Sequence, residues 1–386
     1  MIVKPADRTA NVQEYYFSQK LAQIDRMRRE GSDVINLGIG SPDQPPSENT
    51  VSALIAEAKK PASHGYQSYS GIPSLRKAFS DWYKKYFHVN LNPDNEILLL
   101  MGSKEGIMHI SMAFVNPGDE VLVPDPGYPT YSSVTNLIGG IVRKYDLSEE
   151  NGWLPDLKSL EQSDLSRVKL MWVNYPNMPT GVKGSVDLFE KLVTFSRKHG
   201  ILLVNDNPYS FILNKEYISI LAVEGAKDTA LELNSLSKSH NMAGWRIGMV
   251  AGQSDYIKTV LKVKSNMDSG MFLAMQMAAI EALNNHDSWY DMVNSVYIRR
   301  RKIVEQIMDL LKCSYDKSQI GLFVWGKIPE NIPDCESYVE KILMKSLVFI
   351  TPGFIFGKNG ERFIRISLCA TEEKLNEAKN RITALL

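Results

Sequence analysis

A recurring local pattern constrains the fold of this chain more than any other feature: a short apolar run, a polar turn, then helical periodicity. The apolar runs fall at residues 97–100, 121–123, 170–173 and 201–204. Continuous apolar runs of this length are typical of strands buried on both faces, and their alternation with helices favours a mostly parallel sheet. The pattern therefore predicts an α/β fold.

The polar turns that follow these runs contain most of the unusual residues of the chain. They lie at residues 102–104, 125–128, 174–177 and 206–209. In open α/β sheets, ligands bind beyond the carboxyl ends of the strands. Four such turns together indicate a small-molecule site at one edge of the sheet.

A second, smaller domain is expected towards the C-terminus. A helical stretch at about residues 272–311 precedes a strand-like run at residues 363–368. The length of 386 residues fits one large α/β domain with a smaller companion.

The balance of charged residues limits which kinds of binding partner are expected. Lys plus Arg and Asp plus Glu are both 44, so the net charge is zero. Nucleic-acid and acidic-membrane partners favour a basic surplus, so neither is expected. No apolar run approaches the roughly 18 residues of a membrane span, and the start lacks the apolar core of a secretory signal.

The cysteines and histidines carry little signal for a metal or a disulfide framework. The three cysteines, Cys313, Cys335 and Cys369, are an odd number and are widely spaced. They are typical of reduced thiols in a cytoplasmic protein. The six histidines form no HExxH motif, so no metal site is predicted.

The segment at residues 235–248, Ser-Leu-Ser-Lys-Ser-His-Asn-Met-Ala-Gly-Trp-Arg-Ile-Gly, is the strongest candidate for chemistry. Lys238 is suited to forming a Schiff base, because the fixed cation of Arg246 would help to lower its pKa. Arg246 can also bind a phosphate bidentately, with Ser235 and Ser237 as further donors. Taken alone, the segment is equally compatible with a solvated lysine in a serine-rich loop.

This segment resembles the cofactor-lysine motif of the class I/II aminotransferases, fold type I enzymes that depend on pyridoxal 5′-phosphate (PLP). In that motif a Ser-x-Ser-Lys run is followed, eight residues after the lysine, by an arginine. The resemblance covers nearly the whole chain. It implies that Lys238 carries the cofactor and shuttles the substrate proton, and that Ser235 and Arg246 bind the cofactor phosphate.

The resemblance also implies the architecture. It predicts a large PLP-binding domain at residues 47–275, with a mostly parallel seven-stranded sheet flanked by helices. A smaller α/β domain is then expected from the N-terminal residues 1–46 and the C-terminal residues 276–386.

The turn at residues 102–104 supplies further candidates for binding the cofactor. Gly102, Ser103 and Lys104 lie between a strand and a helix, where bare amides and the helix N-terminus form an anion site, although a plain turn is the alternative. The resemblance places the cofactor phosphate there.

The resemblance implies that the Asp206 carboxylate pairs with the pyridine nitrogen of the cofactor. The pairing keeps this nitrogen protonated, so that the ring acts as an electron sink. On local sequence alone, Asp206 could instead cap the next turn. By the same resemblance, Tyr209 reaches the phenolic oxygen of the cofactor and Tyr128 stacks on its ring, although Tyr128 also fits a turn-prone Pro-Gly-Tyr-Pro.

One position departs from the family pattern. The usual Asn-Pro-Thr-Gly reads Met178-Pro-Thr-Gly here, and a thioether is only a weak acceptor. The missing donor to the phenolic oxygen could come from Asn174 or Asn177. Alternatively, Tyr209 holds that oxygen alone or with a water.

Substrate recognition requires a cation for the α-carboxylate. Arg365 lies in an otherwise apolar strand-like run, and the resemblance assigns it this role, for which a planar guanidinium is suited. Gly40 matches the loop that donates an amide to the same carboxylate. The Gly38-x-Gly40 pair is no dinucleotide fingerprint, because Asp43 stands where the third glycine belongs.

Tyr66 matches a tyrosine that reaches into the phosphate site of a neighbouring subunit, which implies a homodimer with shared active sites. An ordinary exposed loop tyrosine is the alternative, and Tyr69 competes for the assignment.

The implied reaction is a ping-pong transfer of an amino group from an L-amino acid to a 2-oxo acid in the cytoplasm. A carbon–sulfur β-lyase or another PLP reaction remains open, because a fold does not fix a reaction. A non-catalytic PLP-binding homologue is the alternative of another class. Aspartate, alanine, aromatic amino acids and diaminopimelate all remain possible substrates, with residues 266–272 as a candidate lining.

Overall fold

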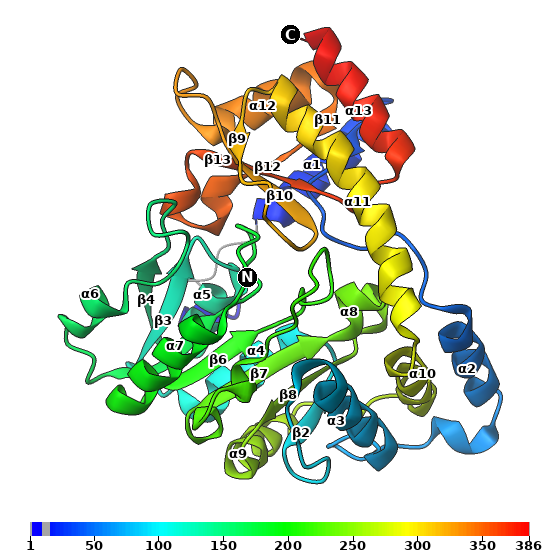
Figure 1. The fold of residues 1–386 in the computed structure, drawn as a ribbon, viewed down its shortest axis with the longest axis vertical. Helices are drawn as coiled ribbons and strands as arrows, with labels where there is room; N and C mark the ends of the chain where they lie inside the picture. Colours follow the sequence, from blue (N-terminus) through cyan, green and yellow to red (C-terminus); the bar gives the residue numbers. More distant parts are fainter. Residues whose placement is uncertain (1, 10–15, 386) are drawn as a thin grey trace.

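The computed structural model describes residues 2–9 and 16–385. A seven-stranded sheet forms the lower part of the molecule in Figure 1, with strand order β2-β8-β7-β6-β5-β3-β4. All neighbouring pairs from β7 to β4 are parallel, and β8 alone runs antiparallel to both of its neighbours. The strands are β2 (Ile97–Leu100), β3 (Glu120–Asp125), β4 (Ile141–Asp146), β5 (Val168–Val173), β6 (Leu202–Asp206), β7 (Ala230–Ser235) and β8 (Gly248–Gly252). The predicted mostly parallel seven-stranded sheet is confirmed.

Both faces of this sheet are covered, which explains the continuous apolar runs. In β2, Leu98 and Leu100 belong to one core cluster, whereas Ile97 and Leu99 belong to another. Alternate residues of a strand point to opposite faces, so each cluster is one face of the sheet with its helices. One face packs on α4 (Ser103–Phe114), α5 (Thr130–Leu137) and α9 (Ser254–Lys264), and the other on α3 (Pro73–Phe87), α7 (Val186–His199) and α10 (Leu273–Leu283).

The upper part of the molecule contains a second, four-stranded antiparallel sheet with strand order β12-β13-β10-β9 (Figure 1). Its strands are β9 (Ser314–Tyr315), β10 (Phe323–Lys327), β12 (Thr351–Pro352) and β13 (Phe363–Ser367). The helices around it are α1 (Tyr16–Arg29), α11 (Asp287–Leu310), α12 (Cys335–Ser346) and α13 (Glu372–Leu385).

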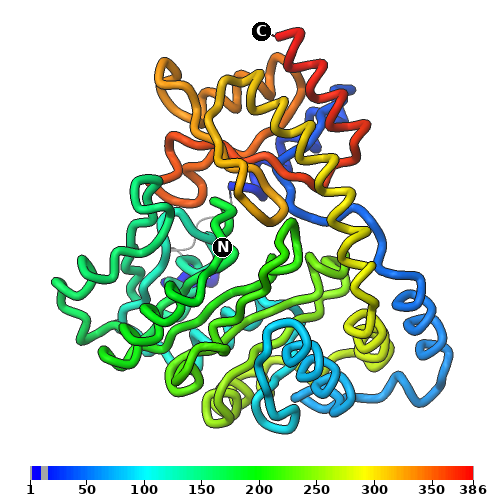
Figure 2. Tube along the Cα trace, in the orientation of Figure 1, coloured from blue at the N-terminus to red at the C-terminus, as the bar shows by residue number. Residues whose placement is uncertain are grey.

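The N-terminal segment from α1 onward lies beside the C-terminal part in the upper half of the molecule, where Figure 2 draws dark blue next to orange and red. Strand β1 (Ile35–Asn36) pairs in parallel with β11 (Val348–Phe349). Ile24 of α1 and Leu343 of α12 share a small core cluster with Phe349. The N-terminal segment therefore packs with the C-terminal part before the chain enters the large sheet.

The single long helix expected at residues 272–311 is instead two helices, α10 and α11. The break falls at residues 284–286, where three consecutive polar residues interrupt the apolar pattern. His286 is the N-cap of α11, and its ring nitrogen accepts the Ser288 N–H at 3.3 Å. A side chain that caps a helix start competes with continuing the helix through it.

Shorter elements complete the chain. They are α2 (Glu48–Ala58), α6 (Leu157–Glu161), α8 (Leu236–Ser239), and the 3-10 turns η1 (Asp7–Thr9), η2 (Pro61–His64), η3 (Ile220–Ala222), η4 (Ala226–Asp228), η5 (Ala243–Trp245), η6 (Gly353–Phe356) and η7 (Lys358–Gly360). In the described ranges, no helix has the length and apolarity needed to cross a membrane.

Candidate active site

A cavity of about 680 Å³ lies at the carboxyl ends of the parallel strands, beneath the four-stranded sheet. The turns after β2, β3, β5, β6 and β7 all open into it, as the strand order requires. The predicted site residues that line it are Gly40, Ser103, Lys104, Tyr128, Asn174, Asp206, Tyr209, Ser235, Ser237, Lys238, Arg246 and Arg365. Gly102, Asn177 and Tyr66 do not line it.

Lys238 is half-buried and lines this cavity, on the short helix α8 that follows β7. Its Nζ donates a hydrogen bond to the backbone oxygen of Gly40 at 2.6 Å. Burial is the main cause that lowers the pKa of Lys238, and the cations of Arg365 and Arg246 lower it further, against Cys369 and Asp206. This lysine is therefore not a solvated loop residue. A larger fraction of its amine is neutral than for a lysine in water at the same pH.

Asp206 ends β6 and is buried. Its Oδ2 accepts a hydrogen bond from the Tyr131 hydroxyl at 3.0 Å, whereas its Oδ1 is buried without a hydrogen-bond partner. Burial raises the pKa of Asp206 to about 6, against the lowering effects of Tyr131 and Lys238. A buried carboxylate oxygen without a partner is costly, so this atom fits a ligand that brings a protonated nitrogen.

The N-terminus of α4 is the predicted anion site. Gly102 is its N-cap with φ +85°, and a Cβ added there would clash with the guanidinium of Arg246. The glycine thus lets Arg246 lie directly against the start of the helix. Burial, and then Arg246, lowers the pKa of Lys104. Two cations beside a helix N-terminus fit a phosphate group, as PLP carries.

Aromatic side chains border the space between Asp206 and Lys238. Tyr128 and Tyr209 both line the cavity, and burial raises the pKa of each hydroxyl. Tyr131, which sequence reasoning missed, stacks on Trp172 with ring centroids 4.9 Å apart and meets Tyr128 edge-on at 5.6 Å. Its spacing of three residues from Tyr128 at a helix start was the available signal.

Arg365 of β13 is the cation on the opposite side of the cavity. Its guanidinium carbon lies 3.8 Å from the ring centroid of Phe323, 4.7 Å from Phe356 and 5.7 Å from Phe17. Burial lowers its pKa to about 10. Within residues 2–9 and 16–385, no carboxylate forms an ion pair with it. A buried cation without a counter-ion fits an anionic ligand.

The hydrogen bonds of Arg365 end on weak or backbone acceptors. Nη2 donates to the Gly38 oxygen at 2.8 Å, and Nη1 donates to the sulfur of Met178 at 3.1 Å. Nε is buried without a partner. Met178, at the position that departs from the family pattern, thus contacts the predicted carboxylate-binding arginine.

The two asparagines near Met178 differ in where they point. Asn174 lines the cavity, but its Nδ2 donates to the backbone oxygen of Asp206 and its Oδ1 accepts the Met178 N–H at 2.7 Å. The Oδ1 of Asn177 accepts from the Thr180 hydroxyl at 2.7 Å within the following turn. The amide of Asn174 is therefore fully occupied, whereas the Nδ2 of Asn177 is buried without a hydrogen-bond partner and Asn177 does not line the cavity.

Gly40 borders the cavity where a side chain would not fit, because a Cβ there would clash with the Phe323 ring. Tyr66 does not line the cavity and is 93% exposed. The residues 266–272, the other candidate lining, also lie outside the cavity. They pack on the Tyr66 loop, where Lys264 Nζ donates to the Tyr69 oxygen at 2.9 Å.

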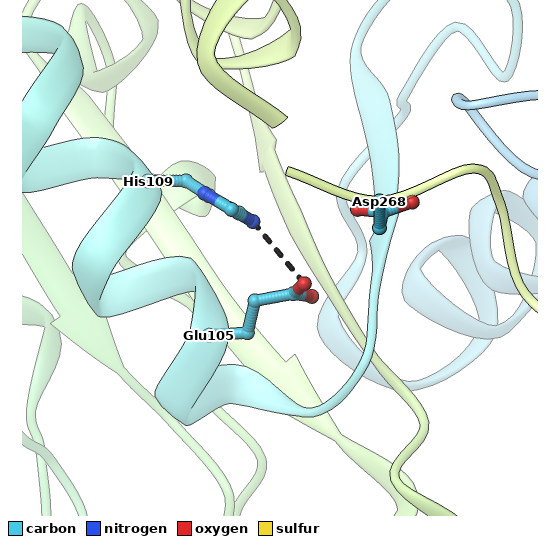
Figure 3. A group of neighbouring side chains, drawn as sticks. All are labelled: Glu105, His109 and Asp268. Carbon is cyan, nitrogen blue, oxygen red and sulfur yellow. Dashed lines mark ion pairs between the residues drawn. The ribbon is translucent and has the colours of Figure 1, made fainter. Parts of the chain in front are cut away.

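A separate cluster of possible metal ligands follows the phosphate turn. Glu105, His109 and Asp268 offer atoms that lie within 4.8 Å of one another (Figure 3). Glu105 and His109 form an ion pair at 3.2 Å if the histidine is protonated. Asp268 already accepts the ammonium of Lys264 at 2.8 Å, and this positive charge opposes binding of a divalent cation.

Comparisons with known proteins agree with this geometry. A family model described as aminotransferase class I and II matches residues 32–382. The chain is 41% identical to an LL-diaminopimelate aminotransferase of Oleidesulfovibrio alaskensis, over 98% of both chains. Substrate-bound BacF from Bacillus subtilis is similar with a TM-score of 0.95 and 32% identity, covering 100% of this chain and 98% of that one. A mutant aspartate aminotransferase of Thermus thermophilus is similar with a TM-score of 0.92 and 26% identity, covering 100% of each chain.

Proposed function

This chain belongs to the class I and II aminotransferase family, and from that premise we propose the roles of its individual residues. It is a PLP-dependent aminotransferase that moves an amino group between an amino acid and a 2-oxo acid. When bound, PLP supplies an electron sink for the charge that develops at the substrate Cα.

The observation that carries the proposal is the position of Lys238, which is half-buried in the cavity wall and bonded to the Gly40 backbone oxygen. A lysine with a lowered pKa presents a neutral amine, which is the nucleophilic form. Lys238 attaches the cofactor through this amine. Once released from it, the same amine would take the proton from the substrate Cα and return it to the cofactor carbon C4′, on the far side of the amino nitrogen. The amino acid and the 2-oxo acid then react in turn, which gives ping-pong kinetics.

The remaining polar groups orient the cofactor. The amides of Gly102, Ser103 and Lys104, with the Arg246 guanidinium, bind its phosphate. Further phosphate donors are the hydroxyls of Ser235 and Ser237.

At the other end of the ring, the free Oδ1 of Asp206 accepts the ring N–H and keeps that nitrogen protonated. Tyr128 stacks on the ring and Tyr209 donates to its phenolic oxygen. Asn174 supports Asp206 through the backbone, and Asn177 shapes the adjoining turn.

Arg365 and Gly40 bind the substrate α-carboxylate. A carboxylate is a much stronger acceptor than the Met178 sulfur, so the substrate displaces that contact and neutralises a buried cation. The guanidinium is already held by aromatic rings and the Gly38 oxygen. Substrate binding therefore costs little side-chain conformational entropy at Arg365.

We further propose that residues 47–275 form a large domain and that residues 1–46 and 276–386 form a small one. The enzyme is a homodimer in which Tyr66 reaches the phosphate site of the second copy. Support comes from three exposed large apolar side chains. They lie on the Tyr66 loop and on the segment 266–272 that packs against it: Tyr66, Tyr69 and Met267. Three free, buried cysteines fit a cytoplasmic location.

Subunit mixing tests the shared site. A Tyr66→Ala variant and a Lys238→Ala variant are each expected to be inactive or strongly impaired. Refolded together, they form hybrids with one intact site, so about a quarter of the sites regain activity. Mixtures that stay at the level of the separate variants contradict a shared active site.

Borohydride reduction tests the role of Lys238. Reduction of the PLP-loaded enzyme, followed by peptide mass mapping, is expected to place the cofactor on the peptide that contains Lys238. Its attachment to a different lysine would overturn the assignment. The names of the curated relatives make LL-diaminopimelate the first compound to assay as a substrate. A carbon–sulfur lyase would instead release a thiol, pyruvate and ammonia from a cysteine-type substrate.

A further inference from the structure

The half of the cavity around Arg365 is apolar. Phe17 and Leu21 are spaced i, i+4 on α1, so both project from one face of that helix into the cavity. Phe323 from β10 and Phe356 from η6 also line this half, and both rings lie against the Arg365 guanidinium. Three separate regions of the chain thus surround the substrate arginine with hydrocarbon.

The ionisable groups of the cavity are unevenly divided. Among the described lining residues, Lys104, Arg246, Lys238 and Asp206 lie at the end assigned to the cofactor. Arg365 is the charged side chain of the other half, and the α-carboxylate of the substrate uses it. A second charged group on the substrate would therefore enter hydrocarbon, with no oppositely charged partner among the residues that the structure describes, which is costly.

The proposed dimer does not change this balance through the loop that reaches across. Residues 66–71 read Tyr-Gln-Ser-Tyr-Ser-Gly and contain no charged side chain. This loop can add apolar surface and neutral donors to the neighbouring site, but no ion to pair with a distal ammonium or carboxylate.

We propose that this enzyme acts on amino acids with a large apolar side chain and discriminates against substrates with a second charged end. The excluded class contains LL-diaminopimelate, the compound in the names of its curated relatives. This inference rests on the proposed function, because it assumes that Arg365 holds the α-carboxylate.

Matched substrates test the inference on the unaltered holoenzyme. L-2-Aminoheptanoate and LL-diaminopimelate share a seven-carbon chain and differ in the second charged end. We expect kcat/KM to be at least about 100-fold higher for aminoheptanoate, because a site without partners rejects a charged group. L-Norleucine and L-2-aminoadipate form a second, six-carbon pair with the same expected order.

A variant tests the location of the discrimination. Leu21→Arg places a cation in the apolar half, and we expect it to raise the kcat/KM ratio of aminoadipate to norleucine by at least about 10-fold. Ala22→Arg, on an exposed position of the same helix, adds the same charge outside the cavity and should leave the ratio unchanged. Equal shifts in both variants would contradict the assigned side-chain site.

The outcomes separate the two levels of the proposal. Faster turnover of LL-diaminopimelate or aminoadipate by the unaltered enzyme overturns the inference and leaves the aminotransferase function standing. An enzyme that transfers the amino group of none of these four compounds, yet acts on small neutral amino acids such as alanine, also overturns it. A holoenzyme that no amino acid converts overturns the proposed function itself, and the inference with it.

Discussion

Tyr131 donates a hydrogen bond to one oxygen of Asp206 at 3.0 Å, and the other oxygen of the same carboxylate is buried without a partner. The contact fixes the orientation of the carboxylate and leaves one acceptor directed at the ligand space. Since buried polar groups are normally satisfied, the free oxygen marks the place where a ligand completes the site.

The first prediction concerns the stability of the cofactor-free protein. Ionising a buried carboxylate whose pKa is raised from 3.8 to about 6 costs folding free energy. That cost is absent below the unfolded pKa near 4 and complete above pH 6, so stability falls as the pH rises through this window.

Asp206→Asn removes this cost, because an amide cannot ionise. Cofactor-free Asp206→Asn should therefore exceed the parent in free energy of unfolding by about 3 kcal/mol at pH 8, and match it below pH 4. Urea unfolding at several pH values measures the difference. A variant that is equally or less stable at pH 8 would mean that the carboxylate is not strained in the empty site.

The second prediction concerns Lys238. Lys238→Arg keeps the positive charge but removes the neutral amine, so we expect kcat to fall by about 10²- to 10⁴-fold, as for loss of a general base. Lys262→Arg, an exposed lysine of α9, is the matched control and should retain full activity. Comparable activity in the two variants would assign the chemistry to another group.

The third prediction concerns the planar guanidinium group of Arg365. Arg365→Lys retains a cation but loses the planar donor pair that suits a carboxylate and the flat faces that contact Phe323 and Phe356. KM for the amino acid should rise by about 10- to 100-fold, with a smaller change in kcat. Steady-state kinetics with both substrates measure the split, and an unchanged KM would move the carboxylate site elsewhere.

The fourth prediction concerns Met178. An asparagine there would supply an amide donor to the phenolic oxygen of the bound cofactor, where a thioether supplies none. A hydrogen-bond donor stabilises the negative charge on the phenolic oxygen, so that this oxygen holds less strongly the proton on the nitrogen that joins Lys238 to the cofactor. Met178→Asn should therefore lower the pH midpoint of the cofactor's visible band. A spectral pH titration that coincides with that of the parent would mean that Tyr209 alone governs this oxygen.

Several features of the fold follow from local sequence. The apolar run at residues 97–100 became β2, because a strand buried on both faces needs apolar residues at every position. The break at residues 284–286 was missed, since a long Met- and Ala-rich pattern masked three polar residues whose capping role depends on side-chain geometry. Element boundaries depend on such contacts, which a sequence pattern does not contain.

The candidate site shows a similar division. Lys238, Asp206 and Ser103 follow strands of one parallel sheet, so their convergence is a consequence of topology. The apolar walls formed by Phe17 and Phe356 come from opposite ends of the chain, and no local signal pairs them. The hydrogen bond between Tyr131 and Asp206 likewise depends on how α5 packs against the sheet, where the Tyr131 ring stacks on Trp172 of β5.

The most direct test of the account follows the visible absorption of the PLP-loaded enzyme through the two half-reactions. A large excess of an L-amino acid with a large apolar side chain, such as norleucine, should abolish the band of the lysine-bound cofactor, and an excess of a 2-oxo acid added after its removal should restore the band. Loss and recovery in this order is the signature of amino-group transfer. A band that norleucine leaves unchanged, or that disappears and does not return with any 2-oxo acid, would contradict the account.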